Sequence, residues 1–326
     1  MRNEVTAVLE SGPGAPAAIS LHRDPGKDGY YSAFCPAAGV GTVYRYQLDD
    51  DATYYPDPAS RYQPGGPHGP SQVIDPGTFS WTDQQWRGPA REAQVIYEMH
   101  IGTFTPEGSW QSARRELAEL AEMGITMLEV MPVADFPGRF GWGYDGVGLF
   151  APTWLYGHAD DMRSFVNDAH ALGMAVILDV VYNHLGPDGN YLRAFSPWYF
   201  SKKYKTDWGE AINFDGEHSA QVREFFVSNA RYWIDEFHLD GLRLDATQEI
   251  RDESPRHILT DISQSARSAA GARRIFLVAE NEAQHTILVR PEKSGGYGLD
   301  ALWNDDFHHS SMVALTAATR LTIRTI

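Results

Sequence analysis

Strand-like apolar runs alternate with helix-forming segments from about residue 89 onward, and this alternation limits the folds open to the chain. Five runs have the character of strands: QVIYEMHIG, ITMLEVMPV, MAVILDVVYN, LDGLRLDAT and RIFLVAEN. Segments with a helical spacing of apolar residues, such as SARRELAELAEM and DDMRSFVNDAHALG, lie between them. This order favours βαβ units, and near-continuous apolar strands are typical of a parallel sheet buried on both faces.

The preceding 88 residues have a different texture. Short alternating runs such as GTVYRYQL lie between segments rich in proline and glycine, such as SGPGAP and YQPGGPHGP, and no helix is evident. This pattern is typical of a small β-sandwich. We therefore expect an α/β chain with a sandwich over residues 1–88 and, over residues 89–316, an incomplete (β/α)8 TIM barrel of about five strands.

Composition restricts the partners and the compartment. The chain has 326 residues and a formal charge of −16, which argues against a nucleic-acid partner and favours a neutral one. The single cysteine, Cys35, fits a reducing compartment. The first residues, MRNEVTAVLE, lack the apolar core of a signal peptide, and no later run is long enough to span a membrane. We expect a soluble cytoplasmic protein with no membrane partner, and the oligomeric state stays open.

Polar residues gather at the ends of the predicted strands. They are His100, Asp179, Asn183, His184, Arg243, Asp245 and Glu280. In a (β/α) barrel the carboxyl ends of the strands form the active face, so these side chains should converge there. In GLRLDA the side chains alternate, which puts Arg243 and Asp245 on one face and Leu242 and Leu244 on the other.

Asp245 and Glu280 end two successive strands and suit retaining glycoside hydrolysis. That reaction needs an ionised carboxylate as nucleophile and a protonated carboxyl about 5 to 5.5 Å away. Arg243 should keep Asp245 ionised, whereas burial after IFLVA should raise the pKa of Glu280. One buried aspartate alone is more often part of a structural ion pair, but three polar strand ends together favour catalysis.

A metal or cofactor is not expected. His308 and His309 lie beside Asp305 and Asp306, but this group does not make a complete ligand set.

Three strings carry a family resemblance. DVVYNH at 179–184, GLRLDA at 241–246 and VAENE at 278–282 resemble, in order and spacing, the first three sequence regions of the α-amylase superfamily of glycoside hydrolases. The resemblance implies that Asp245 is the nucleophile and Glu280 the acid/base. It also implies a set of substrate-binding residues: Arg243, His184, Asp179, Asn183, Tyr144, Trp142 and Trp303. Among these, Asp179 would brace the site and the ring of Tyr144 would stack on a sugar.

A narrower resemblance covers about residues 40–316. YEMHIGTFTPEGSW, GWGYDGVGLFAP, YNHLGPDGNYL and ALWNDDFHHS are similar to the malto-oligosyltrehalose trehalohydrolases, which release trehalose from the end of a malto-oligosyltrehalose chain. This implies cleavage of the α-1,4 bond next to the trehalose end, with malto-oligosyltrehalose or a related α-glucan as the partner. A glucan-branching transferase and a non-catalytic glucan-binding fragment are the alternatives.

The chain also departs from the family pattern. No string like NHD, which supplies the family's third carboxylate, follows Glu280, and the start resembles the middle of the family's N-terminal sandwich. We therefore expect an inactive fragment. The last ten residues, AATRLTIRTI, fit neither the family nor an amphipathic pattern. Loss of one base from a coding sequence for GRNEAYYTDY, a string typical of relatives at this place, reproduces them, so residues 317–326 are predicted to be out of frame.

Overall fold

The computed structural model describes residues 2–27 and 29–316, and the predicted out-of-frame tail at 317–326 lies outside them. The larger part of the molecule is built on a parallel sheet with the strand order β16-β15-β14-β11-β8-β7. Its strands are β7 (Ile96–Met99), β8 (Met127–Val130), β11 (Ala175–Val180), β14 (Gly241–Leu244), β15 (Phe276–Glu280) and β16 (Ala301–Trp303). The prediction of a partial (β/α) barrel is confirmed, with one more strand than the five that the sequence indicated.

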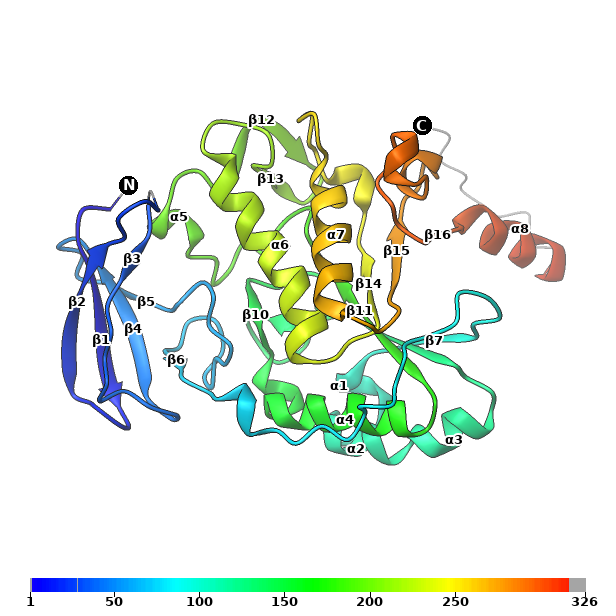
Figure 1. Ribbon diagram of the computed structural model, residues 1–326, viewed down its shortest axis with the longest axis horizontal. Helices are drawn as coiled ribbons and strands as arrows, with labels where there is room; N and C mark the ends of the chain where they lie inside the picture. Colours follow the sequence, from blue (N-terminus) through cyan, green and yellow to red (C-terminus); the bar gives the residue numbers. More distant parts are fainter. Residues whose placement is uncertain (1, 28, 317–326) are drawn as a thin grey trace.

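Helices cover the outer face of this sheet (Figure 1). The longer ones are α4 (Ala159–Ala171), α6 (Ser219–Glu236) and α7 (Ile258–Ala270), and α6 packs against α7. The shorter ones are α1 (Ile101–Phe104), α2 (Trp110–Arg115), α3 (Leu117–Glu122) and α5 (Leu192–Phe195). The predicted helix SARRELAELAEM is divided at Glu116, and α2 begins after Ser109, whose side chain accepts a hydrogen bond from the Ser112 backbone N–H.

The two faces of the parallel sheet have different cores. Residues such as Leu242, Leu244 and Leu277 point outward into the large core shared with the helices. A smaller cluster, Met127, Ala175, Ile177, Phe276 and Val278, lines the inner face, with Ile96 and Trp303 packed against it. Because side chains alternate along a strand, Arg243 and Asp179 also point to the inner face. The predicted two faces of GLRLDA are confirmed.

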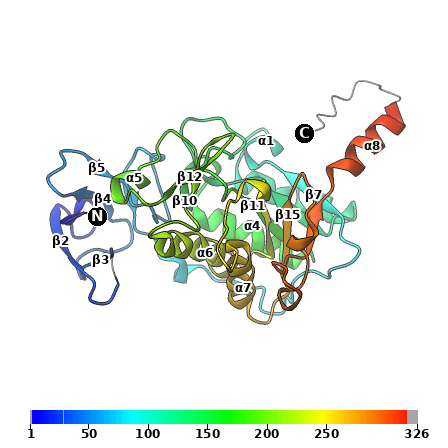
Figure 2. The ribbon, with the colours of Figure 1, turned by 90° about the horizontal axis from the view of Figure 1, so that it is seen from above.

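The N-terminal part is an antiparallel sheet, which lies at one end of the molecule in both views (Figures 1 and 2). Its strands are β1 (Val5–Ser11), β2 (Ala17–Arg23), β3 (Tyr31–Ser32), β4 (Val43–Leu48), β5 (Tyr54–Tyr55) and β6 (Ser71–Gln72). β1 is central, between β2 and β4. A parallel half barrel therefore follows a small sheet domain, as the sequence predicted.

Smaller elements complete the chain. Two antiparallel pairs, β9 (Ala134–Asp135) with β10 (Gly148–Pro152) and β12 (Phe200–Thr206) with β13 (Gly209–Ile212), lie in the connections between strands and helices. Helix α8 (Asp305–Thr316) follows β16 and extends away from the sheet (Figures 1 and 2). Among the helices in the described ranges, none has the length and apolar character needed to cross a membrane.

Candidate active site

Arg243 is the centre of a group of carboxylates at the carboxyl ends of the parallel strands. Its Nη1 donates to both carboxylate oxygens of Asp179, at 2.9 and 2.8 Å, and to Asp245 Oδ1 at 2.7 Å. Its Nη2 lies 3.1 Å from Glu280 Oε2. The carboxylates come from three neighbouring strands, β11, β14 and β15, so one guanidinium joins the two residues predicted to react.

The strand ends explain why these groups meet. Asp179 and Arg243 are register partners in β11 and β14, so their side chains leave the sheet side by side. β14 ends at Leu244, and Ala246 then adopts a left-handed conformation with φ of +37°. This turn lets the Ala246 N–H donate to Glu280 Oε2 at 2.9 Å. A non-glycine residue with positive φ beside such a group is the kind of strain that active sites retain.

Asn183 and His184 follow β11, and Asn183 holds Asp245 from the other side. The Asn183 Nδ2 donates to both the backbone oxygen and Oδ2 of Asp245, each at 2.9 Å. The two carboxylate oxygens of Asp245 are thus fixed separately, one by Arg243 and one by Asn183. His184 Nε2 lies 3.1 Å from the Tyr144 backbone oxygen, and its ring stacks on Trp208 at a centroid distance of 5.4 Å. Burial lowers the pKa of His184, which favours the neutral ring.

Tyr144 and Asp179 form a second layer of contacts. The Tyr144 hydroxyl donates to Asp179 Oδ2 at 2.8 Å. Burial raises the pKa of Asp179 to about 8, against the opposing effect of the Arg243 charge. Burial likewise raises the pKa of Tyr144. Hydrogen bonds from Tyr144 and Arg243 therefore hold Asp179 in the site, as the bracing role proposed for it requires.

The two tryptophans lie differently. Trp142 is 73% exposed in the loop before β10. Trp303 is half-buried at the end of β16, next to Glu280 in register. Its ring packs on the inner face of the sheet, and its Nε1 lies 3.5 Å from Glu129 Oε1.

Glu129, on β8, is a member of this cluster that the sequence reading missed. Its side chain is 3% exposed, and its Oε1 lies 3.8 Å from Arg243 Nε. Burial raises its pKa to about 7, although the Arg243 charge opposes this effect. The signal was available, because Glu129 is the one charged residue in the apolar run ITMLEVMPV. Arg243 is predicted as a site residue on this ground, because it is the one charged residue in the strand GLRL.

Among residues 2–27 and 29–316, with the side chains of Asp305 and His308 left aside, no group of three or more His, Cys, Asp or Glu side chains could hold a metal ion.

The chain is similar to several known proteins. The model of the α-amylase catalytic domain family matches residues 74–209. The malto-oligosyltrehalose trehalohydrolase of Saccharolobus solfataricus is 49% identical over 288 residues, which are 88% of this chain and 50% of that protein. The enzyme of the same name from Arthrobacter ramosus is 41% identical over 319 residues, 97% of this chain and 54% of that protein. The chain thus spans about half the length of these curated relatives.

A transferase and two solved structures are also similar. A 1,4-α-glucan branching enzyme of Pseudoalteromonas atlantica is 30% identical over 87% of this chain and 44% of that protein. A crystal structure from Salmonella typhimurium, of a protein assigned as an α-amylase, is 40% identical, with a TM-score of 0.89 over 98% of this chain and 53% of that one. A type I pullulanase from Bacillus subtilis shares the fold, with a TM-score of 0.74 at 20% identity over 86% of this chain and 44% of that one. The chain is thus similar to the α-amylase family of glycoside hydrolases.

Proposed function

We propose that this chain carries the nucleophile and the acid/base of a retaining glycoside hydrolase that releases trehalose from malto-oligosyltrehalose. The observation that carries the proposal is the position of Arg243, which binds Asp245 and Glu280 through the two ends of one guanidinium. Retention requires two carboxyl groups about 5 to 5.5 Å apart, which is a separation that one guanidinium can bridge. The similarity to trehalohydrolases supports the choice of substrate.

The proposed first step transfers the malto-oligosyl chain to Asp245. An oxygen of Asp245 attacks the anomeric carbon next to the trehalose end and forms a C–O bond, while the bond to the leaving oxygen breaks. Glu280 gives its proton to that oxygen, and trehalose leaves. Arg243 and Asn183 keep the Asp245 carboxylate in one orientation for the attack.

The second step returns the enzyme to its starting state. Glu280, now ionised, takes a proton from water, and the resulting oxygen attacks the anomeric carbon to displace Asp245. Glu280 Oε2 lies 3.1 Å from Arg243 Nη2 and accepts a hydrogen bond from the Ala246 N–H, which hold this carboxyl group in the site. The proposal requires that Glu280 carries a proton when the sugar occupies the site.

The domain limits and location are part of the proposal. A sheet domain at residues 1–88 and a barrel part at 89–316 are supported by the end of β6 at Gln72 and the start of β7 at Ile96. A cytoplasmic location is supported by the unpaired Cys35. Residues 317–326 are proposed to have no part in the reaction.

We propose separately that residues 1–326 alone turn over little substrate, because their parallel sheet has fewer strands than a complete barrel. It has six strands in the part of the chain described, whereas a complete barrel has eight. Incubation of the purified chain with malto-oligosyltrehalose tests this, and trehalose release at the rate of a full-length relative would refute it.

The function itself is tested in a chimera that joins residues 1–316 to the remaining half of the Saccharolobus solfataricus relative. We expect trehalose release from malto-oligosyltrehalose and no new α-1,6 branches in amylose. Asp245→Asn should lower kcat by about three orders of magnitude, with little change in substrate binding. Asp235→Asn, on the exposed face of α6, is the matched control. Branch formation would support the transferase instead, and full turnover in Asp245→Asn would reject the nucleophile.

A further inference from the structure

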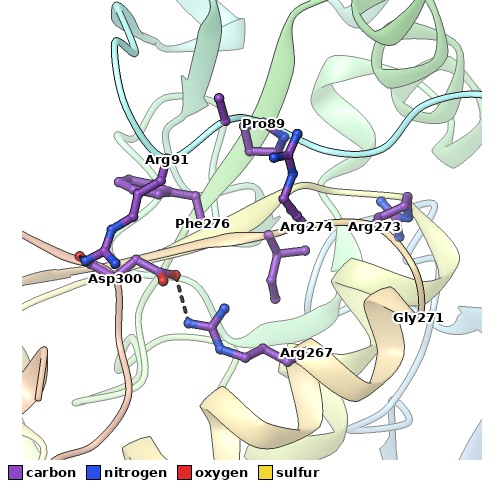
Figure 3. A pocket seen from close by; sticks show the side chains of 10 residues that line it. Pro89, Arg91, Arg267, Gly271, Arg273, Arg274, Phe276 and Asp300 are labelled. Carbon is purple, nitrogen blue, oxygen red and sulfur yellow. Dashed lines mark hydrogen bonds and ion pairs between the residues drawn. The ribbon is translucent and has the colours of Figure 1, made fainter. Parts of the chain in front are cut away.

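A hollow of about 350 Å³ opens at the amino-terminal end of the parallel sheet, opposite the candidate active site. It lies where α7 ends and β15 begins, beside the segment that leads into β7. Its walls include Pro89, Ile275 and Phe276 together with four arginines, Arg91, Arg267, Arg273 and Arg274 (Figure 3). Asp300 is the only acidic residue in this wall. Such a concentration of cations is unexpected in a chain with 43 acidic and 27 basic residues.

Two of the arginines are satisfied by the fold. Arg267 donates from Nη2 to Asp300 Oδ2 at 2.8 Å, a pair visible in Figure 3. Arg273 donates to the backbone oxygens of Ile234 and His238 and so covers the carboxyl end of α6. The charge of Arg267 is thus offset by Asp300, and the guanidinium of Arg273 is held in place by carbonyl groups.

Arg91 and Arg274 are different. Within the described ranges, neither forms an ion pair with a carboxylate. Arg91 Nη2 donates to the Asp300 backbone oxygen at 3.3 Å, and Arg274 Nη2 lies 3.5 Å from the Gly88 oxygen. A guanidinium has five N–H donors, so most of those on these two side chains face the hollow or solvent. The side chains that line the hollow, four arginines and one aspartate, therefore leave an excess of three positive charges, and Arg273 also lies 4.0 Å from Asp240 outside the hollow.

The backbone brings these two arginines together by a close approach. The Arg274 N–H donates to the Arg87 oxygen at 2.9 Å, which joins the segment before β7 to the start of β15. Gly88 has a φ of +78°, and a Cβ at this position would lie 1.9 Å from the Arg274 oxygen. Only glycine fits there, so the two cationic segments are held against each other by the fold.

From this geometry we infer that the hollow binds a phosphomonoester of a small organic molecule. A phosphate group carries a charge of about −1.5 to −2 near neutral pH and accepts paired hydrogen bonds from arginine forks. The apolar wall of Pro89, Ile275 and Phe276 suits the carbon skeleton. The volume lies within the range of about 300 to 1,000 Å³ that small-molecule sites occupy. The inference does not depend on the proposed hydrolysis.

Calorimetric titration of the 326-residue chain tests this site. Glucose 6-phosphate is the probe, inorganic phosphate measures the contribution of the anion, and glucose is the uncharged comparison. We expect glucose 6-phosphate to bind with a Kd below about 1 mM, more tightly than phosphate, and more weakly as sodium chloride is added. The double variant Arg91→Gln and Arg274→Gln should bind at least about tenfold more weakly. Both residues are exposed, so their removal should leave the fold intact.

Two controls make the result specific. Arg139→Gln removes an exposed arginine outside the hollow and should leave binding unchanged. Asp245→Asn should also leave it unchanged, because the catalytic carboxylates lie at the other end of the sheet. Unaltered binding in the double variant would overturn the inference. If phosphate and glucose 6-phosphate bind with equal affinity, the hollow recognises free phosphate and the inferred phosphomonoester is wrong. Binding only above about 10 mM would indicate an adventitious ion only.

Discussion

Arg243 contacts three carboxylates, two of which are largely buried. Its side chain is 8% exposed, and those of Asp179, Asp245 and Glu280 are 0%, 12% and 32% exposed. Removing one partner of a buried ion pair leaves charges without compensation, which is usually more costly than the pair is stabilising. The stability of the carboxyl ends of β11, β14 and β15 should therefore depend on this one side chain.

We predict that Arg243→Gln lowers the free energy of unfolding by about 3–5 kcal/mol at pH 7, measured by urea denaturation. The loss should be smaller at pH 4, because protonated carboxyl groups no longer repel one another. Adding Asp179→Asn should recover part of the loss. Arg231→Gln, which removes an exposed arginine 4.0 Å from Asp235, is the control and should change stability by less than about 0.5 kcal/mol. An equal loss in both single variants would contradict the central role of Arg243.

Glu129 gives a second prediction at the same scale. Burial raises its pKa from 4.5 to about 7, so the unfolded chain releases this proton first as the pH rises. The contribution of Glu129 to stability is present below about pH 4.5 and is lost as the pH rises through about 7. Glu129→Gln cannot ionise and should avoid this loss. Relative to the wild type, it should gain about 2–3 kcal/mol between pH 4.5 and pH 8.

Urea denaturation at both pH values measures this gain. The difference between variant and wild type is the useful quantity, because Asp135 and Asp179 also have raised pKa values of about 7 and about 8. Glu122→Gln, on the exposed surface of α3, is the control and should show no such difference. A constant difference at all pH values would mean that Glu129 does not titrate in this range.

At the scale of elements, the long apolar strands could be predicted and the short one could not. β11 (AVILDV) and β15 (FLVAE) stand out because each begins with four consecutive apolar residues. β16 has only three residues, Ala301–Trp303, and acidic residues flank it, so no period of two can be recognised. The contacts of Arg243 with Asp179 and Glu280 could not be predicted from the sequence either, because they depend on the register between strands.

A second buried network joins the segment before β7 to the helical layer. His170, on α4, lies between Asp83 and Asp240, with ring nitrogens 2.9 and 2.8 Å from their carboxylate oxygens. The Trp86 ring stacks on His170, and its Nε1 donates to Asp240 Oδ1 at 2.7 Å. His238 also contacts Asp83, and Arg273 Nη1 lies 4.0 Å from Asp240. These contacts fasten the connection between the two sheets to the base of the barrel.

The network predicts a dependence of stability on pH. Burial lowers the pKa of His170, but hydrogen bonds from its ring to the carboxylates of Asp240 and Asp83 outweigh this effect and raise the pKa. Its stabilisation is therefore complete below about pH 6.5 and is lost as the pH rises through the higher folded-state pKa. The pKa of Asp83 is lowered to about 2 despite its burial, by hydrogen bonds from His170 and His238. Its contribution is present above about pH 4 and is lost as the pH falls toward 2.

We predict that His170→Gln lowers the free energy of unfolding by about 2–4 kcal/mol at pH 6, because it leaves buried carboxylates without a cation. The difference from the wild type should shrink between pH 6.5 and pH 9. Urea denaturation followed by tryptophan fluorescence measures this difference. His22→Gln, on an exposed position of β2, serves as the control. A loss that stays constant up to pH 9 would show that a neutral His170 stabilises the network equally well.

At the scale of the whole molecule, the N-terminal sheet is joined to the barrel by aromatic contacts and a few polar ones. Phe195 of α5 makes edge contacts with Tyr46 of β4 and Tyr55 of β5, each at a centroid distance of 6.1 Å. Arg61 pairs with Glu236 of α6 at 2.9 Å, and the Tyr30 hydroxyl donates to Glu224 at 2.7 Å. The interface is thus small and partly polar, which is typical of units that can separate.

We predict that Phe195→Ala weakens this interface by about 1–2 kcal/mol, since the ring is half-buried and contacts both strands. Scanning calorimetry should then resolve a low-temperature transition for the sheet domain ahead of the barrel. Phe34→Ala, which removes a ring that is 90% exposed, should leave the trace unchanged. One sharp transition in Phe195→Ala, with the midpoint of the wild type, would mean that the interface does not depend on this ring.

Strand β15 reaches both ends of the sheet within five residues. Phe276 borders the arginine hollow, and Glu280 lies in the candidate active site, about 13 Å away along one extended segment. β15 is hydrogen-bonded to β14 and to β16, so a shift of β15 along its axis requires it to slide relative to both of these strands. Thermodynamic linkage then imposes symmetry: whatever factor an anion in the hollow applies to sugar affinity, the sugar applies to anion affinity. Titrating either ligand in the presence of the other would give the same coupling energy.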